Sequence, residues 1–199
     1  MSTFTLAYDL LNGLIWLPTG SRRLRKQFVD AVGLPSGARV LELGCGTGQV
    51  TAVLVARGAD IVAVDRSGAM LDRARRRAPH ARYVKGNVID VDVEGQFDVV
   101  VLAFVLHELE DEAARAKALS SASEQLGPGG RVAVLDWSLP ADGWRRGAWR
   151  RVVEMIEPNG ATDVLAGCLP AEIDKAGLEV TDVNPLAHGR ASMLLAARR

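Results

Sequence analysis

The stretch Val40-Leu41-Glu42-Leu43-Gly44-Cys45-Gly46-Thr47-Gly48 decides how the rest of the chain is interpreted. Its first four residues form a mostly apolar run typical of a buried strand, and glycines at alternate positions then form a turn. Apolar side chains at helical spacing follow, and Gly58 ends this predicted helix. A second apolar strand covers residues 60–64 and leads into Asp65. Strand, glycine turn, helix, strand and acid together predict a nucleoside-binding βαβ unit.

The residue types in this unit indicate the charge of its ligand. Gly44, Gly46 and Gly48 permit a sharp turn and a close approach of a ligand to the backbone. Asp65 follows Gly44 by 21 residues, at a place where a carboxylate can accept both hydroxyls of a ribose. Glu42 puts a second acid just under the turn, which favours a ligand with positive charge over a pyrophosphate. S-adenosylmethionine carries an ammonium, a sulfonium and a ribose, and no phosphate.

Residues 40–48 resemble motif I of the class I S-adenosylmethionine-dependent methyltransferases, and Asp65 resembles their ribose-binding acid. The resemblance covers about residues 36–137 and resumes at 169–198. It implies S-adenosylmethionine as the cofactor, S-adenosylhomocysteine as its product, and no metal ion. The adenine contact is left open between Asn87 and Asp90. The full set of implied cofactor-binding residues is Tyr8, Glu42, Gly44, Cys45, Gly46, Gly48, Asp65, Arg66, Met70, Asn87, Val88, Ala103 and Phe104.

The order of the predicted elements indicates an α/β, doubly wound fold. Strands alternate with helices, which predicts right-handed crossovers and helices on both faces of a mostly parallel sheet. By resemblance, the sheet is Rossmann-like and seven-stranded, with order 3-2-1-4-5-7-6 and the last strand antiparallel. We expect one domain over residues 1–199, because the length suits one domain and no linker or repeat is visible. Within it we expect an N-terminal lid and helix at residues 1–34 and an insertion over the substrate side at 139–168.

The N-terminal part contains a crowded apolar segment and a helix. Residues 1–19 are interpreted either as a flap over the edge of the core or as a lid over cofactor and substrate. Tyr8 supports the lid, because many methyltransferases carry a tyrosine near the N-terminus that packs over the methionine part of the cofactor. The helix at 21–32 has an apolar face. Its opposite face is interpreted as solvated and carries Arg22, Arg23, Arg25 and Lys26.

Residues 139–168 contain a basic amphipathic helix that Pro158-Asn159-Gly160 ends. One stripe is basic and contains Arg145, Arg146, Arg150 and Arg151. The other stripe is apolar and contains Trp144, Ala148, Val152, Met155 and Ile156. We predict a surface helix whose apolar stripe packs on the core. A substrate lid, or contact with a membrane surface or an anionic group, remains open.

Two residues are candidates for the chemistry. Methyl transfer from a sulfonium is an in-line displacement, so the protein chiefly aligns the partners and excludes water. A phenol or an acidic carbon also needs a base, and His107 after the fourth strand is the best candidate, because imidazole titrates near neutral pH. Its alternative role is to pack or cap before the predicted helix at 111–126. Asp136, near the end of the fifth strand (131–137), is the second candidate base, or else accepts hydrogen bonds from turn amides.

The acceptor is constrained only in class. The segment Phe-Val-Leu-His-Glu-Leu at 104–109 lacks the Asn-Pro-Pro-Tyr motif of amino-methyltransferases, which favours a small molecule. Phe104, Trp137 and Trp144 indicate an apolar or aromatic acceptor. The chain is similar to quinone-biosynthesis and natural-product methyltransferases, but it lacks the Arg-Asn pair typical of quinone enzymes. The alternatives are a phospholipid N-methyltransferase and a non-catalytic S-adenosylmethionine-binding regulatory or scaffold subunit; Glu42 and the glycine pattern disfavour a dehydrogenase.

Composition and charge narrow the partners. Lys+Arg and Asp+Glu both number 24, so the formal net charge is zero and no general attraction to nucleic acid is expected. The two cysteines suit a reducing cytoplasm and form no metal-ligand cluster. No apolar run approaches ~18 residues, and no signal peptide is visible. We therefore expect a cytoplasmic protein with a small-molecule acceptor, no transmembrane segment and an oligomeric state that the sequence leaves open.

Overall fold

The computed structural model describes residues 20–141, 143–157 and 161–199. Seven strands form one sheet with order β3-β2-β1-β4-β5-β7-β6. Neighbouring strands are parallel except at β7, which runs antiparallel to both β5 and β6. The predicted strand order and the antiparallel last strand are therefore confirmed. The strands are β1 (Arg39–Leu43), β2 (Asp60–Asp65), β3 (Arg82–Lys85), β4 (Phe97–Ala103), β5 (Leu126–Trp137), β6 (Leu178–Leu186) and β7 (Ala191–Arg198).

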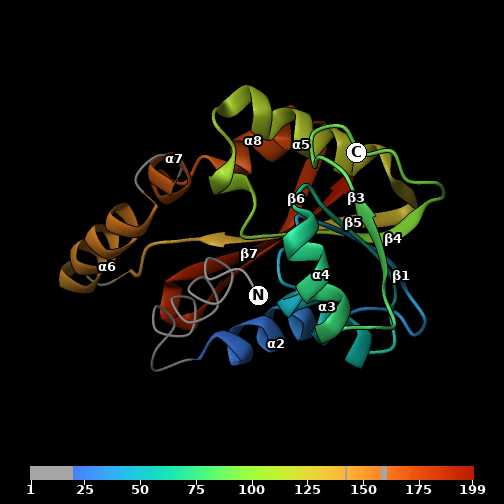
Figure 1. Ribbon diagram of the computed structural model, residues 1–199. Coiled ribbons are helices and arrows are strands. Elements are labelled where there is room, and N and C mark those ends of the chain that lie inside the picture. Colours follow the sequence, from blue (N-terminus) through green and yellow to red (C-terminus); the bar gives the residue numbers. More distant parts are fainter. Residues whose placement is uncertain (1–19, 142, 158–160) are drawn as a thin grey trace.

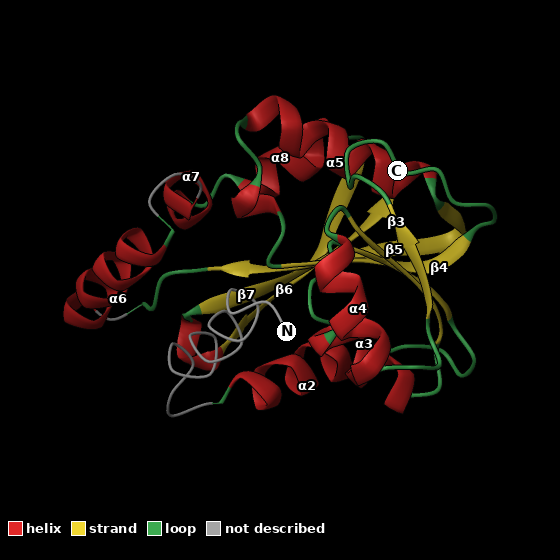
Figure 2. Cartoon of the chain, viewed as in Figure 1, coloured by secondary structure: helices red, strands yellow, loops and turns green. Residues whose placement is uncertain are grey.

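Helices cover both faces of the sheet, as predicted. Helices α2, α3 and α4 lie on one face and α5 and α8 on the other, while α6 and α7 lie beyond the end of β5 (Figures 1 and 2). In the described residues, short 3₁₀ helices are η1 (Leu106–Glu108) and η2 (Ala187–Gly189). The α-helices are α2 (Ser21–Val32), α3 (Gln49–Ala56), α4 (Gly68–Arg77), α5 (Glu112–Glu124), α6 (Gly143–Ile156), α7 (Ala161–Ala166) and α8 (Leu169–Lys175).

The central strands place the candidate site. β1 and β4 are almost continuously apolar because helices bury both faces of a parallel sheet, and residues 99–102 of β4 are fully buried. Leu43 of β1 pairs with Val64 of β2 and with Leu102 of β4, so these strands end together. The residues that follow them therefore meet at one edge of the sheet. This edge is where doubly wound folds bind ligands.

The predicted boundary between the helix at 111–126 and the fifth strand is wrong. The helix α5 ends at Glu124, and β5 already begins at Leu126. Leu126 pairs with Phe97 at the start of β4, and a Cβ on Gly130 would lie 2.8 Å from the carbonyl oxygen of Phe97. The run Gly127-Pro128-Gly129-Gly130 is therefore part of β5 and packs against β4 instead of forming a free turn. The helix α7 was not predicted.

The interpretation of the apolar stripe on α6 is also wrong. The buried residues of this helix are Trp149 and Val153, whereas Trp144 and Met155 are each 77% exposed. The Nε1 of Trp149 donates hydrogen bonds to the carbonyl oxygens of Ser138 (3.0 Å) and Arg190 (3.2 Å), and these contacts fix which side faces inward. The proposed lid segment at 1–19, Tyr8 within it, and the predicted helix stop at 158–160 lie outside the described residues.

Candidate functional site

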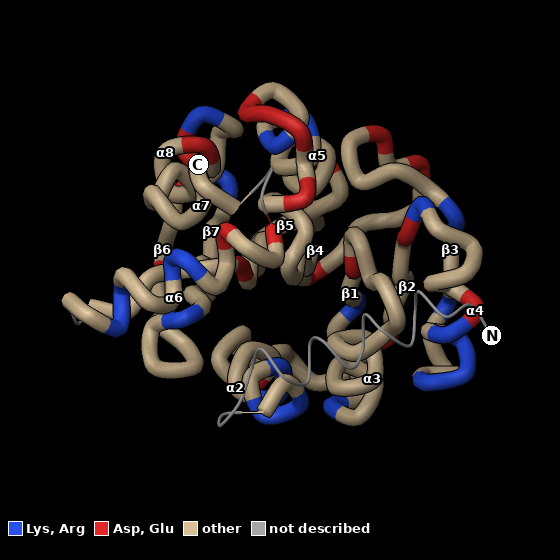
Figure 3. The backbone as a smooth tube through the Cα atoms, turned by 60° about the vertical axis from the view of Figure 1, so that its left-hand side comes forward, with Lys and Arg blue, Asp and Glu red and all other residues tan. Residues whose placement is uncertain are grey.

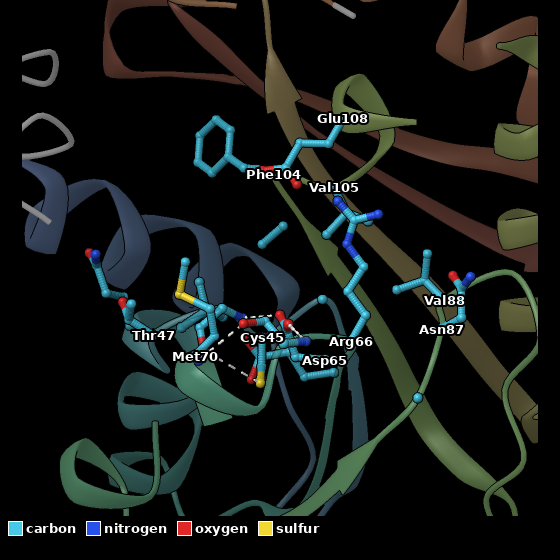
Figure 4. A pocket seen from close by; sticks show the side chains of 18 of the residues that line it. Cys45, Thr47, Asp65, Arg66, Met70, Asn87, Val88, Phe104, Val105 and Glu108 are labelled. Atoms are coloured by element: carbon cyan, nitrogen blue, oxygen red, sulfur yellow. Dashed lines mark hydrogen bonds between the residues drawn. The ribbon is translucent and has the colours of Figure 1, made fainter. Parts of the chain in front are cut away.

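A cavity of about 330 Å³ lies at the carboxyl ends of β1, β2 and β4 (Figure 4). Arg25, Thr47, Gln49 and Ser67 also line it, although the sequence did not point to them. Gly48 is absent from the lining among the described residues, and Tyr8 is not described. The predicted cofactor-binding residues that line it are Glu42, Gly44, Cys45, Gly46, Asp65, Arg66, Met70, Asn87, Val88, Ala103 and Phe104.

Glycine occupies the three positions of the turn for different physical reasons. All three have positive φ, which glycine adopts without strain. A Cβ on Gly44 would lie 2.5 Å from Cγ2 of Val105, and one on Gly48 would lie 2.8 Å from Cα of Ala74. A Cβ on Gly46 would meet no atom within 4 Å. Gly44 and Gly48 are thus required by the packing of the protein itself, whereas Gly46 leaves open space at the cavity.

Asp65 ties the glycine turn to the end of β2. Its Oδ2 accepts a hydrogen bond from the backbone N–H of Gly46 at 2.8 Å, and its Oδ1 accepts one from the N–H of Ser67 at 2.8 Å (Figure 4). A carboxylate has about four acceptor positions, so both oxygens can accept further bonds from a pair of hydroxyl groups. The geometry fits a ribose.

Glu42 is a buried acid at the floor of the cavity. It is 2% exposed, and its Oε2 accepts a hydrogen bond from the hydroxyl of Thr51 at 2.6 Å. Burial raises the pKa of Glu42 to about 8, against the opposing effects of Thr51 and the Arg25 guanidinium. A cationic group in the cavity would favour the charged carboxylate. This site therefore fits the ammonium of an amino acid.

Arg25 is a cavity residue that the sequence analysis placed wrongly on a solvated face. It is 5% exposed, and its Nη1 donates to the carbonyl oxygen (2.9 Å) and the hydroxyl (2.8 Å) of Ser21. Its guanidinium carbon lies 5.9 Å from the centre of the Phe104 ring. A signal was present, because Arg25 precedes the buried Phe28 and Val29 by three and four residues on α2. The cavity thus contains buried groups of both signs.

His107 and Asp136, the two predicted catalytic residues, lie in contact. Nδ1 of His107 is 2.7 Å from Oδ1 of Asp136, and the side chains are 3% and 0% exposed. Asp136 also accepts from the backbone N–H groups of Trp137 (2.8 Å) and His107 (3.3 Å). Burial acts to lower the pKa of His107, but the Asp136 carboxylate outweighs it, so the pKa is raised. Among the described residues, Phe104, Val105 and Glu108 line the cavity and His107 does not.

Aromatic rings connect the cavity with α6. The ring of Trp137 lies 5.1 Å from that of Phe104, 5.7 Å from that of His107 and 5.8 Å from that of Trp149 on α6. Phe104 has φ 58°, which is rare for a residue other than glycine, and its N–H donates to the carbonyl oxygen of Leu135 at 2.7 Å. Figure 4 shows Phe104 across the cavity from Met70 and Cys45. This side of the cavity thus combines the aromatic ring of Phe104 with the carboxyl group of Glu108.

The described part of the chain was predicted to hold no metal ion and no transmembrane segment. It contains no group of three or more His, Cys, Asp or Glu side chains that could hold a metal ion. No helix in the same residues is long and apolar enough to cross a membrane.

Comparisons with known proteins support the same conclusion as the geometry. Residues 40–130 match the family model described as a methyltransferase domain. The chain is 30% identical over 191 residues to an uncharacterized methyltransferase of Synechocystis sp., covering 95% of this chain and 90% of that protein. It is 36% identical over 135 residues to the demethylmenaquinone methyltransferase of Beutenbergia cavernae, covering 67% of this chain. The match spans about half (54%) of that relative's length.

A solved structure shows the same fold. A TehB-like S-adenosylmethionine-dependent methyltransferase from Corynebacterium glutamicum superposes with a TM-score of 0.73 at 21% identity, covering 98% of each chain. The fold and the cavity thus define a class I, Rossmann-like methyltransferase. The chain belongs to the S-adenosylmethionine-dependent methyltransferase family, and S-adenosylmethionine is its cofactor.

Proposed function

We propose that this protein transfers the methyl group of S-adenosylmethionine to a small apolar or aromatic acceptor. The observation that carries the proposal is one cavity with a cluster of charged groups on one side and, on the other, the ring of Phe104 with Val105, Leu109 and the acid Glu108. Glu42, Arg25 and Asp65 form the charged side. Phe104 forms the aromatic side and contacts Trp137. The first side suits the cofactor and the second suits the acceptor.

On the charged side, each residue has a part of the cofactor to hold. When bound, S-adenosylmethionine supplies a methyl group that its sulfonium already activates. Asp65 accepts the ribose hydroxyls, Glu42 accepts from the ammonium, and Arg25 donates to the carboxylate. A buried acid and a buried arginine in one cavity suit a zwitterion, because each compensates one of its charges. Asn87 and Val88 line the same cavity after β3 and would hold the adenine.

On the aromatic side, His107 is the base for an acceptor that must lose a proton. Asp136 is completely buried and accepts hydrogen bonds on both oxygens, so it acts by positioning the His107 ring and not by touching the acceptor. In the methyl transfer that the bound cofactor would support, the imidazole of His107 would take the proton that the acceptor loses. Because His107 is only 3% exposed, this role requires neighbouring side chains to part when the acceptor binds.

The proposed class of acceptors is broader than demethylmenaquinone, the acceptor in the name of one relative. The protein from Beutenbergia cavernae is a demethylmenaquinone methyltransferase, but the segment at 104–109 of this chain has no Arg-Asn pair. We propose that residues 1–199 fold as one domain in which 1–34 and 139–168 cover the acceptor side. Two observations support this placement of residues 139–168. Helices α6 and α7 lie beyond the end of β5, and Trp137 at that end contacts Trp149 of α6.

The proposal is tested with a panel of acceptors. The protein is incubated with S-adenosylmethionine and phenols, hydroxyquinones, compounds with an acidic carbon, and amines, and the products are identified by mass spectrometry. We expect methylation of aromatic acceptors that carry an acidic proton. If S-adenosylhomocysteine binds and none of these acceptors is methylated, the chain is a non-catalytic binding subunit. Methylation of phospholipid amines alone would favour the phospholipid N-methyltransferase.

The role of Arg25 has its own test. The affinity of the protein is measured by calorimetry for S-adenosylhomocysteine and for its analogue without the carboxylate. We expect Arg25→Gln to weaken the first by about tenfold and to leave the second nearly unchanged. Arg22→Gln, on the exposed side of the same helix, is the matched control. Equal losses for both ligands would mean that Arg25 supports the fold of the cavity and does not read the carboxylate.

A further inference from the structure

Helix α6 presents an apolar strip to the outside of the molecule. Trp144, Ala148 and Met155 are exposed, and Trp144 and Met155 are each 77% exposed. Their spacing of four and eleven residues places the three side chains on one side of the helix. Isolated exposed apolar residues are ordinary, but a strip that follows one helix is a typical interaction surface.

The opposite edge of α6 anchors the helix to the body of the protein. Trp149 and Val153 are buried, and the Nε1 of Trp149 donates to two backbone carbonyl oxygens. Because Trp149 and Val153 face inward, the strip of Trp144, Ala148 and Met155 points away from the described core. Its exposure therefore follows from how the helix is held.

Positive charge surrounds the strip. Helix α6 carries four arginines and one acid, Glu154, which makes a formal charge of +3 (4 − 1) in a chain whose net charge is zero. At 100° per residue, Arg145 and Arg151 lie on either side of the strip. The guanidinium of Arg145 lies over the Trp144 ring, 5.5 Å from its centre. Figure 3 shows this local basic region along α6.

A second cavity adjoins the strip. It has a volume of about 430 Å³ and lies between α6 and the 3₁₀ helix η2. Its apolar lining residues are Pro140, Trp144, Ala148, Trp149 and Val152. Its other lining residues are Arg145, His188 and Arg190. Such a lining suits an amphipathic molecule with an apolar chain and an anionic head. It is separate from the cofactor cavity, with which it shares no lining residue among those described.

We propose that α6 docks the protein on the surface of a membrane that contains anionic lipids. Trp144 and Met155 enter the boundary between headgroups and acyl chains, where tryptophan is favoured, and the flanking arginines bind lipid phosphates. A second copy of this chain fits the surface less well, because a two-fold contact would bring two +3 helices together. Docking of α6 on a membrane requires neither a particular acceptor nor methyl transfer.

The test measures co-sedimentation of the full-length protein with vesicles. One set contains phosphatidylcholine only, and the other contains phosphatidylcholine with phosphatidylglycerol. We expect binding to the anionic vesicles that weakens as salt is added. The double variant Trp144→Ser/Met155→Ser and the double variant Arg145→Gln/Arg151→Gln should each bind roughly tenfold more weakly or worse. Arg22→Gln/Arg23→Gln on the exposed side of α2 loses the same charge and should bind as the parent does.

Three outcomes would overturn the proposal. The first is no binding to anionic vesicles at low salt. The second is unchanged binding by Trp144→Ser/Met155→Ser, which would place the contact elsewhere in the chain. The third is a dimer in sedimentation analysis that this double variant abolishes, without vesicle binding, which would assign the strip to a second copy. S-adenosylhomocysteine affinity and melting temperature, measured on the same samples, separate a misfolded variant from a true loss of docking.

Discussion

The two sides of the site differ in how the chain builds them. The centre of the cofactor side is made within a short stretch: Asp65 bonds to Gly46 and Glu42 bonds to Thr51, over 19 and 9 residues of sequence, although Arg25 comes from α2. On the acceptor side, His107 of η1 and Asp136 of β5 are 29 residues apart, and Trp149 reaches Trp137 from a helix beyond the sheet. The centre of the proposed cofactor side thus depends on contacts between residues close in sequence, whereas the proposed acceptor side depends on tertiary contacts.

The largest effect is expected on the acceptor side, from His107→Ala. If the acceptor is a phenol or an acidic carbon, loss of the base should lower the rate by about 10²–10⁴-fold. Cofactor affinity should barely change, because His107 is not among the residues that line the cofactor cavity. Rate, S-adenosylhomocysteine affinity and melting temperature are measured on the same variant. Near-normal turnover by a fully folded His107→Ala protein would rule out the base.

The pH dependence of the rate distinguishes the two members of the pair. Burial lowers the pKa of His107, but the Asp136 carboxylate raises it above its ordinary 6.5, and only the neutral imidazole accepts a proton. The rate should therefore rise with pH through a value above 6.5. Asp136→Asn removes the charge that raises the pKa, so the rise should move to lower pH. If the profile stays in place while the rate falls, Asp136 does not set the protonation of His107.

A large effect on the cofactor side is expected from Gly46→Val. A Cβ there meets no protein atom within 4 Å, so a valine side chain extends into the cavity and the affinity for S-adenosylhomocysteine should fall by at least about 100-fold, about 2.8 kcal/mol. Because Gly46 has φ +52°, valine also strains the turn, and the melting temperature should fall as well. Gly44→Ala is the informative comparison, because its Cβ would lie 2.5 Å from Val105. That variant should lower the melting temperature first. Calorimetry and thermal unfolding separate the two effects, and tight binding by Gly46→Val would place the ligand elsewhere.

The same division explains what the sequence could predict. The βαβ unit around residues 40–65 was predicted correctly because its strands, glycines and acid are adjacent in sequence. The inward face of α6 was predicted wrongly, because apolar residues cover about half of that helix and only the Trp149 contacts select one edge. Arg25 was missed because an arginine on an amphipathic helix is usually solvated, and its contact with the ring of Phe104, which follows β4, joins residues far apart in the sequence. The pairing of His107 with Asp136 required the alignment of β4 and β5.

A smaller effect on the cofactor side is expected from Asp65→Ala. Removing hydrogen bonds to a charged acceptor should weaken S-adenosylhomocysteine binding by about 1.5–3 kcal/mol. Asp60→Ala, at the exposed start of the same strand, is the control and should leave affinity unchanged. Because Asp65 also accepts from the N–H groups of Gly46 and Ser67, the melting temperature of the free protein must be compared. An unchanged affinity in Asp65→Ala would move the ribose contact to another residue.

The smallest effect concerns the proton on Glu42, and it tests whether the buried acid meets a cation. With a pKa of about 8 in the free protein, Glu42 is mostly protonated at pH 7. Pairing with an ammonium requires the carboxylate, so binding of S-adenosylhomocysteine should release close to one proton at pH 7 and tighten about fivefold from pH 7 to pH 8. Calorimetry in two buffers with different ionisation enthalpies measures the proton count. Glu42→Gln keeps an oxygen that accepts from Thr51 but cannot ionise, so it should bind more weakly without proton release or this pH dependence. If the parent releases no proton and its affinity is flat over this range, the ammonium binds away from Glu42, and the acid serves only to hold Thr51 beneath the glycine turn.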